Sequence, residues 1–455
     1  MSTSHDRTTS GRSVPFWRTL LYALANAAGM LTYWTFNNYI LYFYTDVKKL
    51  PPRWVGRGWF AFGFWNAVND PVAGWLSDRT RTRWGRRRFY IGVLAIPTAV
   101  AFALVWLPPF DASNPAALMV YFLVIISIYD MLQSIVTLNQ DALFPEMYES
   151  TADRATGAGA RQLVGALVGN GLAVALSPAV YGTWGWGALA ALWGTASAAM
   201  YLLSLLGIQE RSTVGEPPQP SWRQQMRIVF TNRAFLIVIG INFVIRFLIA
   251  VIGATMPFYA EYVLGLAEAQ LSKLLLALFV ASGVAILGWQ VVVRRVGTRA
   301  AMIASMAAAG VLALPLLVTT DVTATALVLG AMGLAVGGLI LGPDMLFAEV
   351  VDDDFVRTGQ RREGMYRGIL GFVFRFPPAV AGLLLNESLA LAGYDAHLTA
   401  ATQPHAAILV IRLFASVLPL GALLIGLALL WRYPLHGDYL QRIQRQAAVL
   451  RRPSA

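Results

Sequence analysis

The sequence contains no cysteine and few charged side chains for its length. Without cysteine it can form neither a disulfide framework nor a thiolate metal site, so its stability has to come from packing. Only 13% of the 455 residues are charged, whereas 57% are hydrophobic and the mean hydropathy is +0.57. Such a composition is too apolar for a soluble fold of this size. The sequence therefore predicts an all-α integral membrane protein.

Histidine is scarce as well, which argues against catalysis. No spacing typical of metal ligands and no pairing of a nucleophile with a base occurs in the sequence. We therefore expect no metal centre, no cofactor and no enzyme activity, and a membrane-embedded enzyme stays only as an alternative. The four histidines lie in the tails or in one predicted outer loop: His5, His397, His405 and His436.

The formal net charge of +11 comes from arginines that cluster in short segments between apolar runs. This distribution is the positive-inside pattern of membrane proteins, and it requires no nucleic acid as a partner. Residues 1–18 are polar and carry arginine, without a short apolar core and a small-residue cleavage site. They predict a cytosolic tail and not a signal peptide.

Long apolar runs are abundant, and each is long enough to cross a bilayer, which takes about 20 residues. Twelve of them form two groups of six, separated by a polar stretch with the Pro217-Pro218-Gln219-Pro220 turn. We predict twelve transmembrane helices in five parts: a cytosolic tail at 1–18, a six-helix bundle at 19–208, a cytoplasmic linker at 209–233, a second six-helix bundle at 234–431 and a cytosolic tail at 432–455. The runs lie near 19–44, 55–77, 89–108, 116–138, 161–181, 185–208, 234–262, 272–294, 299–318, 323–346, 365–391 and 405–431.

The loop charges predict the orientation. Arginines follow the even-numbered runs, and most of the other loops carry little charge, which places both termini in the cytoplasm and the protein in the plasma membrane. The first outer loop dissents, since it carries Lys48, Lys49, Arg53 and Arg57.

The second apolar run contains a polar face. On a helix Asn66, Asn69 and Asp70 stand at i, i+3 and i+4, so two amides and a carboxylate gather on one side, which cannot face lipid. Pro71 donates no backbone N–H and frees an acceptor beside Asp70. A carboxylate within a spanning helix is normally paired, faces a cavity and is functional, so we predict a coupling site here, with a structural ion pair as the alternative.

This stretch continues as a basic loop, and together they resemble a known family. Asp70-Pro71 with Gly74, followed by Thr80-Arg81-Thr82-Arg83-Trp84-Gly85, is similar to the segment between helices two and three of the glycoside–pentoside–hexuronide:cation symporters. The resemblance implies the major facilitator superfamily fold, in which two six-helix bundles rock around a central cavity.

The resemblance also implies a coupling cation, H⁺ or Na⁺, at Asp70 and Asn69. The first acid of the family's pair falls on Asn66, so this site holds one carboxylate and two amides, and sodium binds less strongly where fewer negative charges surround it. Sodium coupling at Asp70, proton coupling and uncoupled transport all stay open.

Other polar residues predict a substrate cavity. At the positions of the family's two sugar-binding acids this sequence has Thr137 and Met30, so the family's galactoside contacts do not carry over. Asn139 offers either another polar contact or a cap at the end of the helix. Asp130 lies two turns before Thr137 on roughly the same face, and it could instead be the partner of Arg246, which stands within the seventh run.

Arg375 occupies the place of a functional lysine in the family's eleventh helix. Pro377 and Pro378 follow it, which predicts a kinked or broken helix there. Arginine keeps its proton, so Arg375 could neutralise Asp70 or hold an anionic substrate such as a uronate or a lipid phosphate.

Charged segments on the cytoplasmic side predict a gate. Acidic residues near 344–363, in a segment that resembles the family's loop between helices ten and eleven, could form breakable ion pairs with the arginines of the first bundle, and a solvated charged loop is the alternative. The predicted gate residues are Arg79, Arg83, Arg86, Arg154, Arg161, Glu349, Asp352 and Glu363.

Together these features predict a secondary active transporter that works by alternating access. The expected substrate is a sugar, glycoside or hexuronide-like compound, moved with a proton or sodium ion by a monomer embedded in membrane lipid. The alternatives are a carrier of lysolipids or other amphiphiles with the same fold and, further off, a non-transporting receptor.

Overall fold

The computed structural model describes residues 14–79, 82, 84–85, 87–148, 151–208, 231–359 and 362–450. The regular structure in these ranges is helical throughout, with no strand. Some side chains within the helices fall outside the described part, among them those of Asp70 and Arg154.

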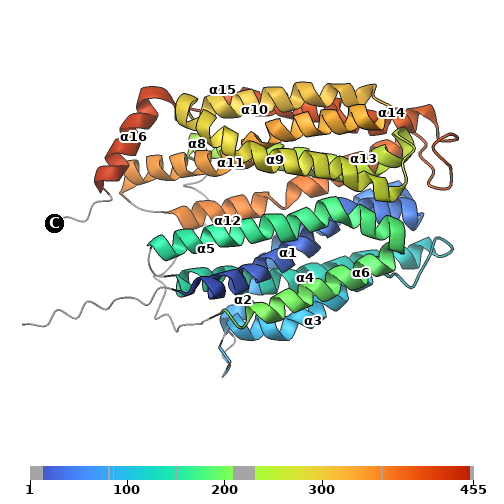
Figure 1. The fold of residues 1–455 in the computed structure, drawn as a ribbon, viewed down its shortest axis with the longest axis horizontal. Coiled ribbons are helices and arrows are strands. Elements are labelled where there is room, and N and C mark those ends of the chain that lie inside the picture. The colour runs from blue at the N-terminus through green and yellow to red at the C-terminus, as the bar shows by residue number, and fades with distance from the viewer. Residues whose placement is uncertain are drawn as a thin grey trace, which may run out of the picture.

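The first set of helices forms the layer drawn from blue to green in Figure 1. Helix α1 packs against η2 and against α6. Gly185 has φ +82° and divides α6, because a left-handed backbone of this kind ends a helix, and this break falls in the predicted outer loop. The elements are α1 (Phe16–Tyr42), η1 (Phe43–Val47), α2 (Pro52–Arg79), α3 (Arg87–Trp106), α4 (Pro115–Met147), α5 (Thr151–Val164), η2 (Gly165–Leu176) and α6 (Ser177–Ser204).

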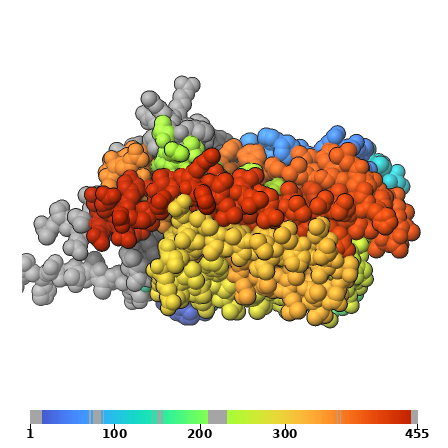
Figure 2. Space-filling view, turned by 90° about the horizontal axis from the view of Figure 1, so that it is seen from above, coloured from blue at the N-terminus to red at the C-terminus, as the bar shows by residue number. Residues whose placement is uncertain are grey.

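The second set of helices, drawn from yellow-green to red, forms the other layer in Figure 1, and Figure 2 shows its helices side by side on one face of the molecule. Its elements are α8 (Arg233–Phe258), η3 (Tyr259–Val263), α9 (Glu268–Val296), α10 (Thr298–Ala313), η4 (Leu314–Leu317), α11 (Val322–Thr358), α12 (Glu363–Val373), α13 (Phe376–Leu391), α14 (His405–Ala415), α15 (Val417–Trp431) and α16 (Gly437–Leu450).

Nine helices in the described ranges are long and apolar enough to cross a membrane. One of them, Thr156–Ser204, contains the break at Gly185. The all-helical membrane fold is therefore confirmed, while the count of twelve spans stays a prediction. The domain boundaries stay predictions as well, since residues 209–230 of the expected linker lie outside the described part.

The two sets of helices meet along three main lines. Helix α2 packs against α13, α1 packs against α8, and η2 and α6 pack against α9. A helix break interrupts the α2–α13 line: α12 ends at Val373 and α13 begins at Phe376, with Pro377 and Pro378 in the first turn of α13. Proline is tolerated there because the first turn has no intrahelical partner for its N–H groups. The break predicted at these prolines is thus present.

Candidate functional site

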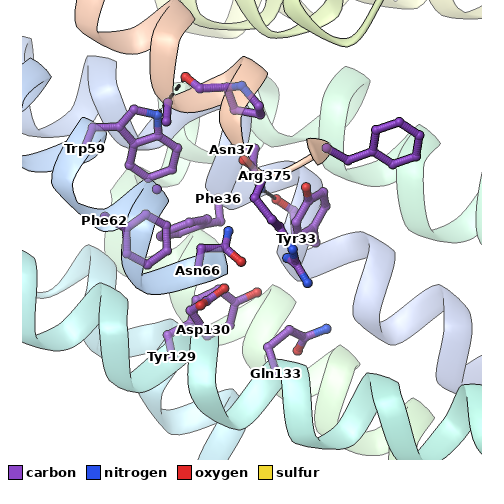
Figure 3. Close-up of a pocket in the computed structure, with 14 residues that line it drawn as sticks. Tyr33, Phe36, Asn37, Trp59, Phe62, Asn66, Tyr129, Asp130, Gln133 and Arg375 are labelled. Carbon is purple, nitrogen blue, oxygen red and sulfur yellow. Dashed lines mark hydrogen bonds between the residues drawn. The ribbon is translucent and has the colours of Figure 1, made fainter. Parts of the chain in front are cut away.

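A pocket of about 440 Å³, counting the part that opens to solvent, lies where α1, α2 and α4 face the break between α12 and α13. Figure 3 shows amide, carboxyl and guanidinium groups pointing into it. Aromatic rings form much of the remaining wall. The labelled lining residues are Tyr33, Phe36, Asn37, Trp59, Phe62, Asn66, Tyr129, Asp130, Gln133 and Arg375.

A buried carboxylate and a buried amide join α4 to α2 at the floor of this pocket. Asn69 Nδ2 donates to Asp130 Oδ2 at 2.9 Å, and both residues are less than 10% exposed. A charge-assisted bond of this kind holds a carboxylate that burial would otherwise make costly. The structure thus brings together Asp130 and the predicted polar face of the second helix.

Two amide oxygens beside this pair have no hydrogen-bond partner among the described residues. They are Oδ1 of Asn66 and Oδ1 of Asn69, and both are buried. Buried acceptors without a donor are costly unless a ligand completes them, so they are ready ligands for a cation or a substrate hydroxyl. Asp70 follows Asn69 in α2, but its side chain lies outside the described part.

Arg375 enters the pocket from the second set of helices. It lies in the two-residue turn between α12 and α13, and its side chain points toward Tyr33 and Asn66 in Figure 3. The pocket therefore has a guanidinium on one wall and the Asp130 carboxyl on the opposite wall. This arrangement suits a ligand that bridges the two bundles.

A second pocket adjoins the first and shares Tyr33, Trp59 and Phe374 with it. One residue that the sequence predicts for the cavity, Arg246, lines this second pocket. Its guanidinium carbon lies 3.7 Å from the centre of the Phe374 ring. Arg246 is exposed to this space and forms no ion pair or hydrogen bond with any residue that the structure describes. A permanently charged side chain in mid-helix, with a ring face beside it, indicates a place for an anion.

Two other predicted cavity residues lie deeper. Thr137 accepts a hydrogen bond from Gln133 Nε2 at 3.4 Å, and Asn139 donates to the Ile135 carbonyl of its own helix at 2.8 Å. Asn139 is only 1% exposed, and neither residue lines the two pockets.

Sequence reasoning did not single out several pocket residues. Gln133 stands three residues after Asp130 and four before Thr137, so helical spacing could have found it. Asn37 is followed directly by Asn38, and two adjacent amides within an apolar run could have marked it. Trp59 carries no such signal, because it stands among apolar and aromatic neighbours that are as typical of packing. Of the first-helix aromatics, Tyr33, Trp34 and Phe36 line the pockets.

The gate residues that the structure describes, Arg161, Glu349, Asp352 and Glu363, lie at one end of the molecule, here termed the Arg-rich end and marked by the end of α2, the start of α3 and α16. Arg161 pairs with Asp141 of its own half, and Glu349 accepts from Thr298 and Tyr433 of its own half at 2.6 and 3.0 Å.

One further gate residue has a local partner among the described residues. Glu363 pairs with Arg367 one turn away at 3.2 Å. The side chains of Arg79, Arg83, Arg86 and Arg154 lie outside the described part, so the gate stays a prediction.

Polar contacts between the two halves gather at the opposite end. Arg53 and Arg57 bind Glu387 at 3.2 and 2.6 Å, and Thr45 donates to Asn386 at 3.0 Å. The basic residues of the first outer loop, which dissent from the positive-inside pattern, are thus used to join the halves. Together with Tyr42 and Asp46, they close the molecule at this end.

Comparisons with known proteins agree with this architecture. The family described as MFS/sugar transport protein matches residues 21–437. The isoprimeverose transporter of Lactiplantibacillus pentosus is 25% identical over 84% of this chain and 82% of its own length. The glucuronide carrier protein homolog of Escherichia coli is 25% identical over 92% and 93%, and the sodium-dependent lysophosphatidylcholine symporter 1-A of Danio rerio is 23% identical over 97% and 90%.

Solved structures show the same fold at low identity. A bacterial homolog of the human lysosomal transporter Spinster, inward-facing and unoccupied, has a TM-score of 0.70 at 13% identity, covering 97% of this chain and 99% of its own. The nucleoside transporter NupG has a TM-score of 0.64 at 12% identity, covering 92% and 100%.

The matched family covers nearly the whole chain, its relatives are symporters and carriers, and the fold is that of major facilitator transporters. The chain therefore belongs to the MFS/sugar transport protein family, within the glycoside–pentoside–hexuronide:cation symporter group that its motifs resemble, and it is a secondary transporter and not an enzyme.

Proposed function

We propose that this chain is a cation-coupled symporter for an anionic glycoside of the hexuronide type. The observation that carries the proposal is a pair of cavity-facing arginines: Arg375 shares the first pocket with the Asp130 carboxyl, and Arg246 lines the adjoining pocket. A neutral sugar needs no guanidinium, whereas a carboxylate on the sugar gains charge-assisted hydrogen bonds from it.

The walls between these charges suit a sugar ring. Trp59 and Phe62 present aromatic faces to the pocket, and Asn37, Gln133 and Asp130 offer donors and acceptors for hydroxyl groups. Flat rings pack on the apolar face of a sugar while carboxylate and amide groups bind its hydroxyls. The E. coli relative is named as a glucuronide carrier homolog, which agrees with such a ligand.

The coupling cation would bind on the other side of the pocket, across from Arg375. Asn66 and Asn69 supply the two oxygens without a protein donor, and Asp130 lies against Asn69. We propose that these groups and Asp70 bind the coupling H⁺ or Na⁺, which neutralises the carboxyl side before the two halves close over the substrate. Transport then proceeds by alternating access in the plasma membrane, with both termini in the cytoplasm and a monomer as the working unit.

A lysolipid or similar amphiphile is the second candidate, and one feature favours it. The pocket around Arg246 is lined on its other sides by Trp34, Leu41 and Ile249, so a phosphate at Arg246 could be combined with an apolar chain. The Danio rerio relative is named as a lysophosphatidylcholine symporter.

Uptake into proteoliposomes separates these candidates. Labelled methyl glucoside, methyl glucuronide and lysophosphatidylcholine are offered with a proton gradient, a sodium gradient or none. We expect gradient-driven accumulation of the glucuronide above the glucoside. Accumulation of the lysolipid alone would establish the second candidate, and failure of all three under every gradient would contradict the proposed substrate class.

A further inference from the structure

The two halves are joined at the end opposite the arginine clusters by a network of carboxyl and tyrosine hydroxyl groups that transport through the central pocket does not explain. Its members come from four segments: the end of α1 with η1, η3, the start of α9 and the loop after α13. We call this network the latch; it consists of Tyr42, Asp46, Glu261, Tyr262, Glu268 and Tyr394.

Most contacts of the latch cross between the halves. The Tyr42 hydroxyl lies 2.7 Å from Glu261 Oε2 and 3.0 Å from Glu268 Oε1. Asp46 is 4% exposed, and its Oδ1 accepts from Tyr262 at 2.5 Å and from Tyr394. Opening this end of the transporter has to break these bonds, because their partners lie in opposite halves.

The latch has more acceptors than its hydroxyl protons can satisfy. The Tyr42 hydroxyl carries one proton but contacts two carboxyl groups, so one of the two bonds needs a proton on a carboxyl group. The contacts as they stand therefore hold at least one proton beyond those of the tyrosines.

Basic groups near the latch are directed elsewhere. Lys48 lies over the Phe43 ring at 5.6 Å, and Lys49 donates to the Ala396 carbonyl. Arg53 and Arg57 bind Glu387. None of the three latch acids forms an ion pair with a lysine or arginine within the described ranges, so a proton is the cation that balances their charge.

The tyrosines remain donors throughout this process. Burial, followed by the neighbouring Asp46 carboxylate, raises the pKa of Tyr394 far above its usual range. The exchangeable proton therefore belongs to the acids. When this end opens, water reaches the carboxyl groups and solvates their ionised form, so the bound proton can leave.

We propose that the latch is a proton-binding site between the halves: it takes up at least one proton as the end opposite the arginine clusters closes and releases it to the water on that side as this end opens. Closing binds protons, so a lower pH favours the closed form and a higher pH favours opening. This site is separate from the central pocket, and it makes the conformational equilibrium sensitive to pH without any substrate.

A distance measurement tests this proposal, and the absence of native cysteine allows specific labelling. Spin labels at Ala112→Cys and Thr320→Cys, both exposed and in loops of opposite halves at this end, report opening by double electron–electron resonance. In the full-length protein in nanodiscs, we expect the ratio of closed to open molecules to rise by up to tenfold per unit fall in pH for each linked proton.

Glu261→Gln mimics the protonated acid, so we expect this variant to stay closed at all pH values from 5.5 to 8.5. Glu268→Gln provides the same test if the first variant does not fold, because Glu268 is the other carboxyl group in contact with the Tyr42 hydroxyl. Glu387→Gln is the matched control: it removes ion pairs at the same end and should shift the ratio equally at every pH. A pH-independent wild type, an unchanged slope in both Glu261→Gln and Glu268→Gln, or a slope lost in Glu387→Gln would overturn the proposal.

Discussion

At the residue scale, the buried pair of Asn69 and Asp130 sets the chemistry of the pocket. Helical spacing predicts the polar face of α2, because Asn66 and Asn69 are one turn apart, and the run of α4 predicts Asp130. The sequence could not predict that Asn69 donates to Asp130, since this bond joins residues 61 positions apart. Nor could it choose between Arg246 and other partners for Asp130.

Asp130→Asn tests the coupling role of this acid. The substituted amide keeps the size of the carboxyl and can still accept from Asn69, so we expect folding and substrate exchange to persist, while accumulation driven by a gradient falls to passive equilibration. Asp141→Asn is the control, because Asp141 lies on the same helix but pairs with Arg161 outside the pocket. Undiminished accumulation in Asp130→Asn would remove this carboxyl from coupling.

At the element scale, α2 and α13 approach each other closely where glycines face the partner helix. A Cβ atom on Gly63 would lie 2.6 Å from the Ala379 Cβ, and one on Gly382 would lie 2.4 Å from Trp59 Cδ1. Small residues at such crossings allow helix backbones to pack in lipid. This contact joins the halves from the pocket toward the closed end, so it belongs to the conformational change.

Gly63→Ala should therefore weaken the closed form. Both clashing atoms are attached to the backbone, so the helices have to separate, and overpacking of this kind typically costs about 1–3 kcal/mol. The same spin-label pair should show a closed-to-open ratio reduced by about tenfold or more. Gly371→Ala is the control, since a Cβ there meets no atom within 4 Å. Equal ratios in the two variants would show that this contact does not hold the end closed.

The elements were predictable to different degrees. Pro377 and Pro378 predict the break between α12 and α13, and the Trp184–Gly187 stretch predicts the break at Gly185. Helix α16 was not predicted within the expected cytosolic tail, although Leu440, Ile443 and Ala447 stand there at helical spacing. Its docking through Tyr439 to Asp353 at 3.0 Å depends on α11, which no local pattern contains.

At the scale of the whole molecule, apolar runs and arginine clusters predict the fold and the sidedness, but not which end is closed. Charged residues at each end could join the halves, and which end is closed depends on which of these contacts form. Glu349 illustrates this: the sequence predicts a contact with the other half, whereas Thr298 and Tyr433 of its own half bind it. The free energies of two conformations of one chain differ by a few kcal/mol, and no local pattern carries that difference.

Sidedness itself can be measured on the intact protein. Gln441→Cys is on the exposed face of α16, at the end where the arginines cluster, and Thr320→Cys is exposed at the opposite end. Because clustered arginines remain on the cytoplasmic side, a membrane-impermeant thiol reagent should label Thr320→Cys in intact cells and Gln441→Cys only in inside-out vesicles. The inverse labelling would reverse the orientation, place the closed end in the cytoplasm and require the latch to exchange its proton there.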